Sequence, residues 1–113
     1  MFPDRLRNLC LLVSDEARER RVKIVTAESC TGGMLAALFT EFSGSSDVFE
    51  RGFVTYSNRS KEEMLGVPGD MIADYGAVSE AVARLMAEGA LENSRANLSL
   101  AITGIAGPGG GTP

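Results

Sequence analysis

Histidine and tryptophan are absent from the chain, and only two of its 113 residues are cysteine. Without imidazole groups, the chain cannot supply a Ser-His-Asp or Cys-His catalytic set or a histidine-ligated metal site. Any hydrolytic chemistry in it must therefore use serine, threonine, cysteine, lysine, tyrosine or carboxylate side chains. Cys10 and Cys30 stand far apart in the sequence, and we interpret them as two free thiols, as a reducing cytoplasm favours.

Long apolar runs and basic clusters are absent as well. No run approaches the ~20 residues needed to cross a bilayer, and the N-terminal residues lack the pattern of a signal peptide. The net charge of −4 argues against a broad surface for nucleic acid or anionic membranes. A small phosphorylated ligand is compatible with this charge, because a few backbone amides can hold a phosphate. The scattered carboxylates have no metal-ligand spacing, so we expect no bound metal. We also expect no cofactor and a cytoplasmic location.

The remaining composition, with 44% hydrophobic and 23% charged residues, is that of one globular domain. Apolar residues at helical spacing predict a helix over residues 4–20 and another from Ser79, as its N-cap, to Leu91. Shorter helices are predicted over MLAALFTEF, from Asn58 as N-cap through KEEMLGV, and over DMIADYG up to Gly76. Short β-branched and apolar segments predict strands over residues 22–27, 52–57 and 98–103.

Strands that alternate with helices predict an α/β sheet with helices on its faces. Three strands leave one edge of the sheet unpaired beside residues 98–103. From this edge and the glycine-rich ending GIAGPGGGTP, we infer either further strands beyond Pro113 or a mobile C-terminal loop. An open edge also favours association, so we expect a homo-oligomer.

Polar or glycine-rich turns follow all three predicted strands, with the sequences ESCTGG, SNRSK and TGIAGPGGG. In open α/β sheets, ligands bind beyond the carboxyl ends of the strands. We therefore expect the three turns to form one shared cleft.

The first of these turns, from Ser29 to Gly33, precedes a predicted helix. Glycines at a helix start let backbone N–H groups approach an anion closely, aided by the helix dipole. A plain N-cap by Ser29 or Thr31 explains the same residues, and the motif alone favours that simpler interpretation. It is neither G-x-G-x-x-G nor a Walker sequence.

Lys61 falls in the first turn of the helix that Asn58 would cap. A cation at that end of the helix dipole is unfavourable by ~0.3–1 kcal/mol, and the same field lowers the lysine pKa. A neutral lysine can activate a serine where no histidine exists. Spacing alone nevertheless favours an ordinary surface lysine whose stem covers the strand end.

The candidate nucleophiles are Ser29, Cys30, Ser45, Ser46 and Ser57. Cys30 at a helix start has the setting of a reactive thiolate, although a small hydrophobic side chain facing the core is the preferred interpretation. Ser46 opens a short helical turn, which an N-cap also explains.

Two further positions at the strand ends have chemical potential. Tyr56 could stack on an aromatic ring or donate a hydrogen bond, or it is a half-buried aromatic residue at the sheet edge. Thr103 and Gly104 could supply backbone donors for an oxyanion, or they simply end the strand.

Several blocks of the sequence together resemble the C-terminal domain of the competence/damage-inducible CinA family. They occur in the family's order and span nearly everything from Thr26 onward, whereas residues 1–25 match only in pattern. The blocks are TAESCTGG (26–33), GSSDVFERGFVTYSN (44–58), Lys61, LGVP (65–68), GAVSE (76–80), MAEGAL (86–91) and TGIAGPGGGTP (103–113).

The resemblance implies a three-layer α/β/α sandwich with a mixed sheet, forming a single domain over residues 1–113. It also implies a nicotinamide-nucleotide amidase, which hydrolyses nicotinamide mononucleotide to nicotinic acid mononucleotide and ammonia in pyridine-nucleotide recycling. Members of the family look like Ser/Lys hydrolases, which agrees with the absence of histidine from this chain. The residues carried over as catalytic are Ser29, Ser46 and Lys61; those carried over as substrate-binding are Thr31, Gly32, Gly33, Tyr56, Thr103 and Gly104.

Family members continue past GPGGGTP with further strands and a C-terminal helix, and that region usually carries an arginine suited to the substrate phosphate. We expect this domain to be truncated before that region. Within the chain, we expect Ser29 to attack the carboxamide after neutral Lys61 has removed its proton, directly or through Ser46. Ser46 as nucleophile with Ser29 as relay is a rival assignment. A non-catalytic nucleotide- or phosphosugar-binding module and a Cys30-dependent hydrolase are the alternative functions.

Overall fold

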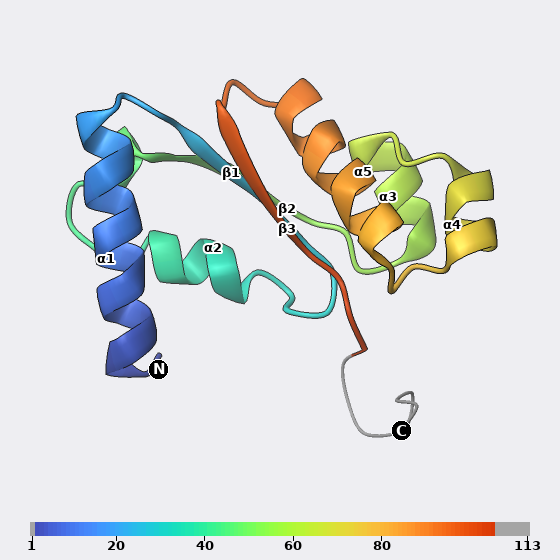
Figure 1. The fold of residues 1–113 in the computed structure, drawn as a ribbon, viewed down its shortest axis with the longest axis horizontal. Coiled ribbons are helices and arrows are strands. Elements are labelled where there is room, and N and C mark those ends of the chain that lie inside the picture. Colours follow the sequence, from blue (N-terminus) through green and yellow to red (C-terminus); the bar gives the residue numbers. More distant parts are fainter. Residues whose placement is uncertain (1, 106–113) are drawn as a thin grey trace.

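The computed structural model describes residues 2–105. Helices and strands alternate along much of this range (Figure 1). The helices are α1 (Asp4–Glu19), α2 (Met34–Phe39), the 3₁₀ turn η1 (Ser45–Asp47), α3 (Asn58–Leu65), α4 (Gly69–Tyr75) and α5 (Glu80–Glu92). The strands are β1 (Ile24–Glu28), β2 (Phe49–Val54) and β3 (Leu98–Ile102). The predicted helices and strands are therefore confirmed, with shifts of their ends.

The sheet has the order β2-β1-β3, and both pairs of neighbouring strands run parallel. All five residues of β1 are buried, as expected for a central parallel strand covered on both faces. The mixed sheet implied by the resemblance requires an antiparallel strand, and residues 2–105 contribute none.

The second strand differs most from its prediction, since it spans Phe49–Val54 rather than 52–57. Ladder pairing with β1 begins at Phe49, opposite Ile24, and this pairing draws residues before Gly52 into the strand. At the other end the chain leaves the ladder to begin α3.

Helices cover the two faces of the sheet, with α1 and α2 on one side and α3, α4 and α5 on the other (Figure 1). Alternation along β1 explains the division, because successive side chains of a strand point to opposite faces. Ile24 joins the α1/α2 core, whereas Val25 and Ala27 join the core beneath α3–α5. The three-layer α/β/α architecture is thus confirmed.

One predicted helix cap is wrong. Asn58 is the first helical residue of α3, and the N-cap is Ser57, whose hydroxyl accepts from the Ser60 N–H at 3.0 Å. Lys61 is consequently the fourth helical residue and lies one position deeper than expected. The predicted cap of α5 is confirmed, since the Ser79 hydroxyl accepts from the Val82 N–H.

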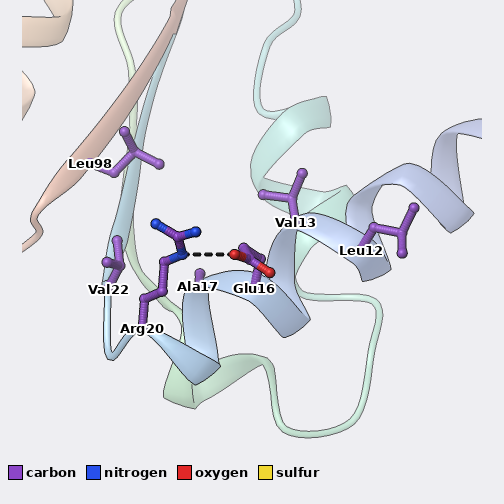
Figure 2. A pocket seen from close by; sticks show the side chains of 7 residues that line it. All are labelled: Leu12, Val13, Glu16, Ala17, Arg20, Val22 and Leu98. Carbon is purple, nitrogen blue, oxygen red and sulfur yellow. Dashed lines mark hydrogen bonds and ion pairs between the residues drawn. The ribbon is translucent and has the colours of Figure 1, made fainter.

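The flank between α1 and β3 is open and apolar. Leu98 and Leu100 on β3 are 44% and 37% exposed. A hollow of about 510 Å³ lies there, and Figure 2 shows its lining side chains: Leu12, Val13, Glu16, Ala17, Arg20, Val22 and Leu98. The two charged residues of this hollow, Arg20 and Glu16, pair with each other at 2.7 Å. The other lining residues are apolar, so the hollow contains no serine, cysteine or lysine that could act as a nucleophile.

None of the helices within residues 2–105 has both the length and the apolar character needed to span a membrane.

Gly89 allows α5 to cross α3 closely, and its replacement gives a stability prediction. A Cβ at this position would meet the Leu65 carbonyl oxygen. Although alanine is the better helix former, we expect Gly89→Ala to lower the free energy of unfolding by about 1–3 kcal/mol through overpacking. Urea unfolding followed by circular dichroism measures this change. The exposed neighbour change Glu88→Ala is the control and should stay within about 0.5 kcal/mol; an equally stable Gly89→Ala protein would contradict the close crossing.

Candidate active site

The turns that follow the three strands meet at one edge of the sheet, because parallel strands all end at the same side. The Ser29 N–H donates to the Ile102 carbonyl at 3.0 Å, and the Thr55 N–H donates to the Glu28 carbonyl at 2.7 Å. A Cβ at Gly104 would lie 3.0 Å from the Cys30 sulfur. The described parts of the three turns therefore lie at one edge of the sheet, and the cleft predicted between them stays a prediction.

Lys61 is buried at this edge, with only 1% of its surface exposed. Its amine Nζ lies 3.0 Å from the Ser29 hydroxyl oxygen, 3.1 Å from the Thr55 carbonyl oxygen and 3.1 Å from the Tyr56 carbonyl oxygen. The interpretation of Lys61 as an ordinary surface lysine is therefore wrong. Its side chain reaches from the second turn of α3 to the end of β1.

These three contacts suit a neutral amine as well as an ammonium, which has three N–H donors. Two carbonyl oxygens can only accept, so they take two amine hydrogens. In the structure the amine donates to the Ser29 hydroxyl, which itself donates to the Tyr56 carbonyl. If the amine is neutral and its two hydrogens go to the carbonyls, its lone pair faces the Ser29 hydroxyl. Thus the two backbone carbonyls orient the Lys61 amine toward Ser29.

Burial favours that neutral form. Desolvation lowers the pKa of Lys61 below the usual lysine range, and the nearby Cys30 thiol opposes the shift as a smaller effect. No carboxylate within 4.0 Å forms an ion pair with Lys61 in the part of the chain that the structure describes. The cause of the lowered pKa is thus chiefly burial rather than the helix dipole that the sequence suggested.

Ser29 has the position of a nucleophile directly after β1. It is 5% exposed, and its hydroxyl also lies 3.3 Å from the Tyr56 carbonyl oxygen. That carbonyl therefore contacts both Ser29 and Lys61, and it fixes their relative position.

Glu28 is a site residue that the sequence interpretation missed. Its carboxylate is fully buried and accepts hydrogen bonds from the Thr31 hydroxyl at 2.7 Å and from the N–H groups of Leu35 and Ala36 at 2.8 and 3.0 Å. These two N–H groups of α2 are therefore already bonded within the chain, whereas an anion-binding role for the Thr31–Gly33 turn stays a prediction. An acidic residue five to seven positions before a predicted helix was the available signal.

Ser46 is not part of this arrangement. It precedes β2 in η1, it is exposed, and its carbonyl accepts from Lys23, which precedes β1. Both residues lie at the amino edge of the sheet, roughly 16 Å from Ser29 by the rise of a five-residue strand. The assignment of Ser46 as relay or nucleophile beside Lys61 in one chain is therefore wrong, and Ser45 lies at the same distant edge.

The other expected residues lie at the carboxyl edge with varied roles. The Tyr56 side chain is 66% exposed, and the Thr103 hydroxyl donates to the Ala77 carbonyl at 2.8 Å.

Gly32 and Gly33 both have positive φ values, of 60° and 104°, which glycine adopts readily in such a turn. Cys30 is half-buried rather than in the core. Within residues 2–105 no three acidic or cysteine side chains cluster as metal ligands would.

Comparison with known proteins relates the sequence and fold of this chain to a family. The sequence model of the CinA C-terminal domain matches residues 7–113. A CinA-like protein of Akkermansia muciniphila is 58% identical over 95 residues, which cover 84% of this chain and 23% of that protein. A CinA-like protein of Colwellia psychrerythraea is 49% identical over 109 residues, covering 96% of this chain and 25% of its own length.

Solved structures agree. The competence/damage inducible protein CihA of Agrobacterium tumefaciens superposes with a TM-score of 0.96 at 48% identity, covering 99% of this chain and 68% of its own. A CinA superfamily protein of Escherichia coli gives a TM-score of 0.91 at 38% identity, covering 98% of this chain and 66% of its own. The chain therefore spans about two thirds of those structures and about a quarter of the curated relatives. With the fold and nearly all of its sequence matched, the chain belongs to the CinA C-terminal domain family.

Proposed function

We propose that this domain is an amidohydrolase in which Ser29 is the nucleophile and Lys61 the general base. The observation that carries the proposal is the buried Lys61 amine 3.0 Å from the Ser29 hydroxyl, held by two carbonyl oxygens. The proposed substrate is nicotinamide mononucleotide, converted to nicotinic acid mononucleotide and ammonia. This choice of substrate follows the family resemblance of the sequence blocks around these residues.

In the first half of the reaction, neutral Lys61 takes the hydroxyl proton while Ser29 Oγ attacks the carboxamide carbon. Negative charge develops on the carboxamide oxygen, and backbone N–H groups at the Thr103–Gly104 end of β3 are the proposed donors to it. The carbon–nitrogen bond then breaks, and the Lys61 ammonium returns the proton to the leaving ammonia. An ester between Ser29 and the nicotinate carbon remains.

In the second half, a water molecule gives its proton to Lys61 and attacks the same ester carbon. The Ser29–carbon bond breaks, Ser29 recovers its proton from Lys61, and the acid leaves. The exposed Tyr56 ring, 66% accessible, is proposed to stack on the pyridine ring. Because the Leu35 and Ala36 N–H groups are already bonded to Glu28, the phosphate must use other groups.

Replacing either dyad residue tests the proposal. We expect Lys61→Met, which keeps an unbranched apolar stem, to lower kcat for ammonia release by about 10²–10⁴-fold, since it removes the general base. Ser29→Ala should lose at least as much, while both variants still bind the nucleotide. Ammonia release is measured on the 113-residue chain and on a version extended to the length of the solved relatives.

Ser46→Ala is the matched control, because this serine lies at the far edge of the sheet, and its kcat should stay near the unchanged protein's. Full activity of Lys61→Met would refute the dyad. Nucleotide binding without any ammonia release, in both chain lengths, would instead support a non-catalytic binding module.

The lowered pKa of Lys61 sets the direction of the pH dependence. Only the neutral amine accepts a proton, so kcat/KM should rise with pH through the Lys61 pKa and then level off, with a midpoint below the ordinary lysine value of about 10.4. The unfolded chain holds the lysine proton to higher pH, so the free energy of unfolding should also rise between the lowered and the ordinary pKa. Rate profiles and urea titrations between pH 6 and 10 measure both slopes. Lys61→Met should remove the rising contribution to stability and leave the opposite contribution of Cys10, whose thiol pKa is raised by burial. A rate that falls across this range would contradict a neutral base.

Cys30 provides the test against a thiol mechanism. We expect Cys30→Ala to keep activity within about tenfold of the unchanged protein, because losing an activated nucleophile typically costs orders of magnitude more. Ammonia release under saturating substrate measures this effect. Loss of activity comparable to that of Ser29→Ala would favour the cysteine.

A further inference from the structure

Glu28 is a buried acidic residue whose side chain is hydrogen-bonded to the turn that carries Ser29 and to the start of α2. No part of its surface is exposed. Its carboxylate accepts from the Thr31 hydroxyl and from two backbone N–H groups of α2. Hydrogen bonds to an ionised carboxylate are roughly twice as strong as neutral ones, and a negative charge is favourable at a helix N-terminus. The residue thus ties the end of β1 to the start of the next helix.

The pleat of β1 assigns Glu28 and Ser29 to different sides of the sheet. Ile24, with the same parity as Glu28, packs in the α1/α2 core, while Val25 and Ala27 pack under α3–α5. Ser29 shares the parity of Val25 and Ala27, and it contacts Lys61 from α3. Glu28 therefore secures the turn from the α2 side, and Lys61 approaches Ser29 from the α3 side.

The backbone of Glu28 also reaches the second half of the site. Its carbonyl oxygen accepts from the Thr55 N–H at 2.7 Å and lies 3.4 Å from the Thr55 hydroxyl oxygen. The carbonyls of Thr55 and Tyr56 in turn accept from the Lys61 amine. One residue is thus bonded both to the turn around the nucleophile and to the segment that orients the base.

We propose that Glu28 is a positioning residue that holds Ser29 in register with Lys61, an inference that rests on the proposed Ser29–Lys61 mechanism. Its side chain is an internal anion that satisfies the N–H groups at the start of α2, so the turn is rigid before any substrate arrives. A cap with a merely structural role would stabilise the protein equally but would not set the reactivity of Ser29.

The test measures Ser29 reactivity apart from substrate turnover. Glu28→Gln keeps the side-chain length but replaces one acceptor oxygen with an NH₂ donor that faces N–H donors. We expect it to lower kcat between about 10-fold and 10²-fold, as for a misplaced reacting group, with KM nearly unchanged. The rate of Ser29 labelling by a fluorophosphonate should fall by a similar factor, while the pH midpoint of that rate stays in place.

Three variants make the outcome decisive. Glu28→Asp retains the charge and should recover part of the labelling rate. Thr31→Val removes a single hydrogen bond, tests the same turn if Glu28→Gln does not fold, and should reduce labelling a few-fold. Val48→Ala truncates a buried residue at the amino edge and should lower Tm without changing the labelling rate.

Labelling and kcat of Glu28→Gln equal to those of the unchanged protein would overturn the proposal. Slow labelling in Val48→Ala to the same extent would also overturn it, since general destabilisation would then explain the effect. A Glu28-dependent labelling rate without ammonia release would leave the positioning role standing and refute the proposed amidase. An unchanged protein that never labels at Ser29 would contradict both.

Discussion

The contact between the Lys61 amine and the Ser29 hydroxyl organises the carboxyl edge of the sheet. A buried lysine is unfavourable when charged, and the fold compensates with two carbonyl acceptors and one hydroxyl. These partners suit a neutral amine as well as they suit an ammonium, whereas an ion pair would hold the proton on the lysine. In the proposed mechanism, a chain without histidine in this way obtains a base oriented by its own backbone.

The parallel sheet supplies the framework for that contact. Ser29 follows the central strand β1, and the two carbonyls follow its neighbour β2, so the ladder between these strands sets the spacing. Helix α3 starts directly after its N-cap, Ser57, and this start places Lys61 beside the same strand ends. Glu28 completes the framework, because it is bonded through its backbone to β2 and through its side chain to α2. Lys61, Ser29 and the segments between them are therefore joined by continuous hydrogen bonds.

Much of this arrangement could be predicted from the sequence, and the failures have physical causes. Hydrophobic periodicity and turn residues predicted the strands, the main helices and the shared edge of the sheet, because these features follow from local sequence patterns. The burial of Lys61 could not be found by spacing, because its four-carbon stem reaches into the sheet edge only once β1 and α3 are packed. Ser46 was misplaced because the family assignment was followed although Ser46 precedes the second predicted strand, and the start of a parallel strand lies at the opposite edge from Ser29. Glu28 was missed because two of its three side-chain partners are backbone N–H groups of α2, and the one available signal, an acidic residue shortly before a predicted helix, does not show that the two meet.

Because the contact between Lys61 and Ser29 lies out of water, dissolved ions cannot gather around it. Screening acts on exposed charges over about 10 Å at moderate ionic strength and much less on buried groups. In the proposed reaction, added salt would therefore weaken the long-range attraction or repulsion felt by an anionic nucleotide as it approaches this acidic surface. The proton transfer itself would be nearly indifferent to the ionic composition of the medium.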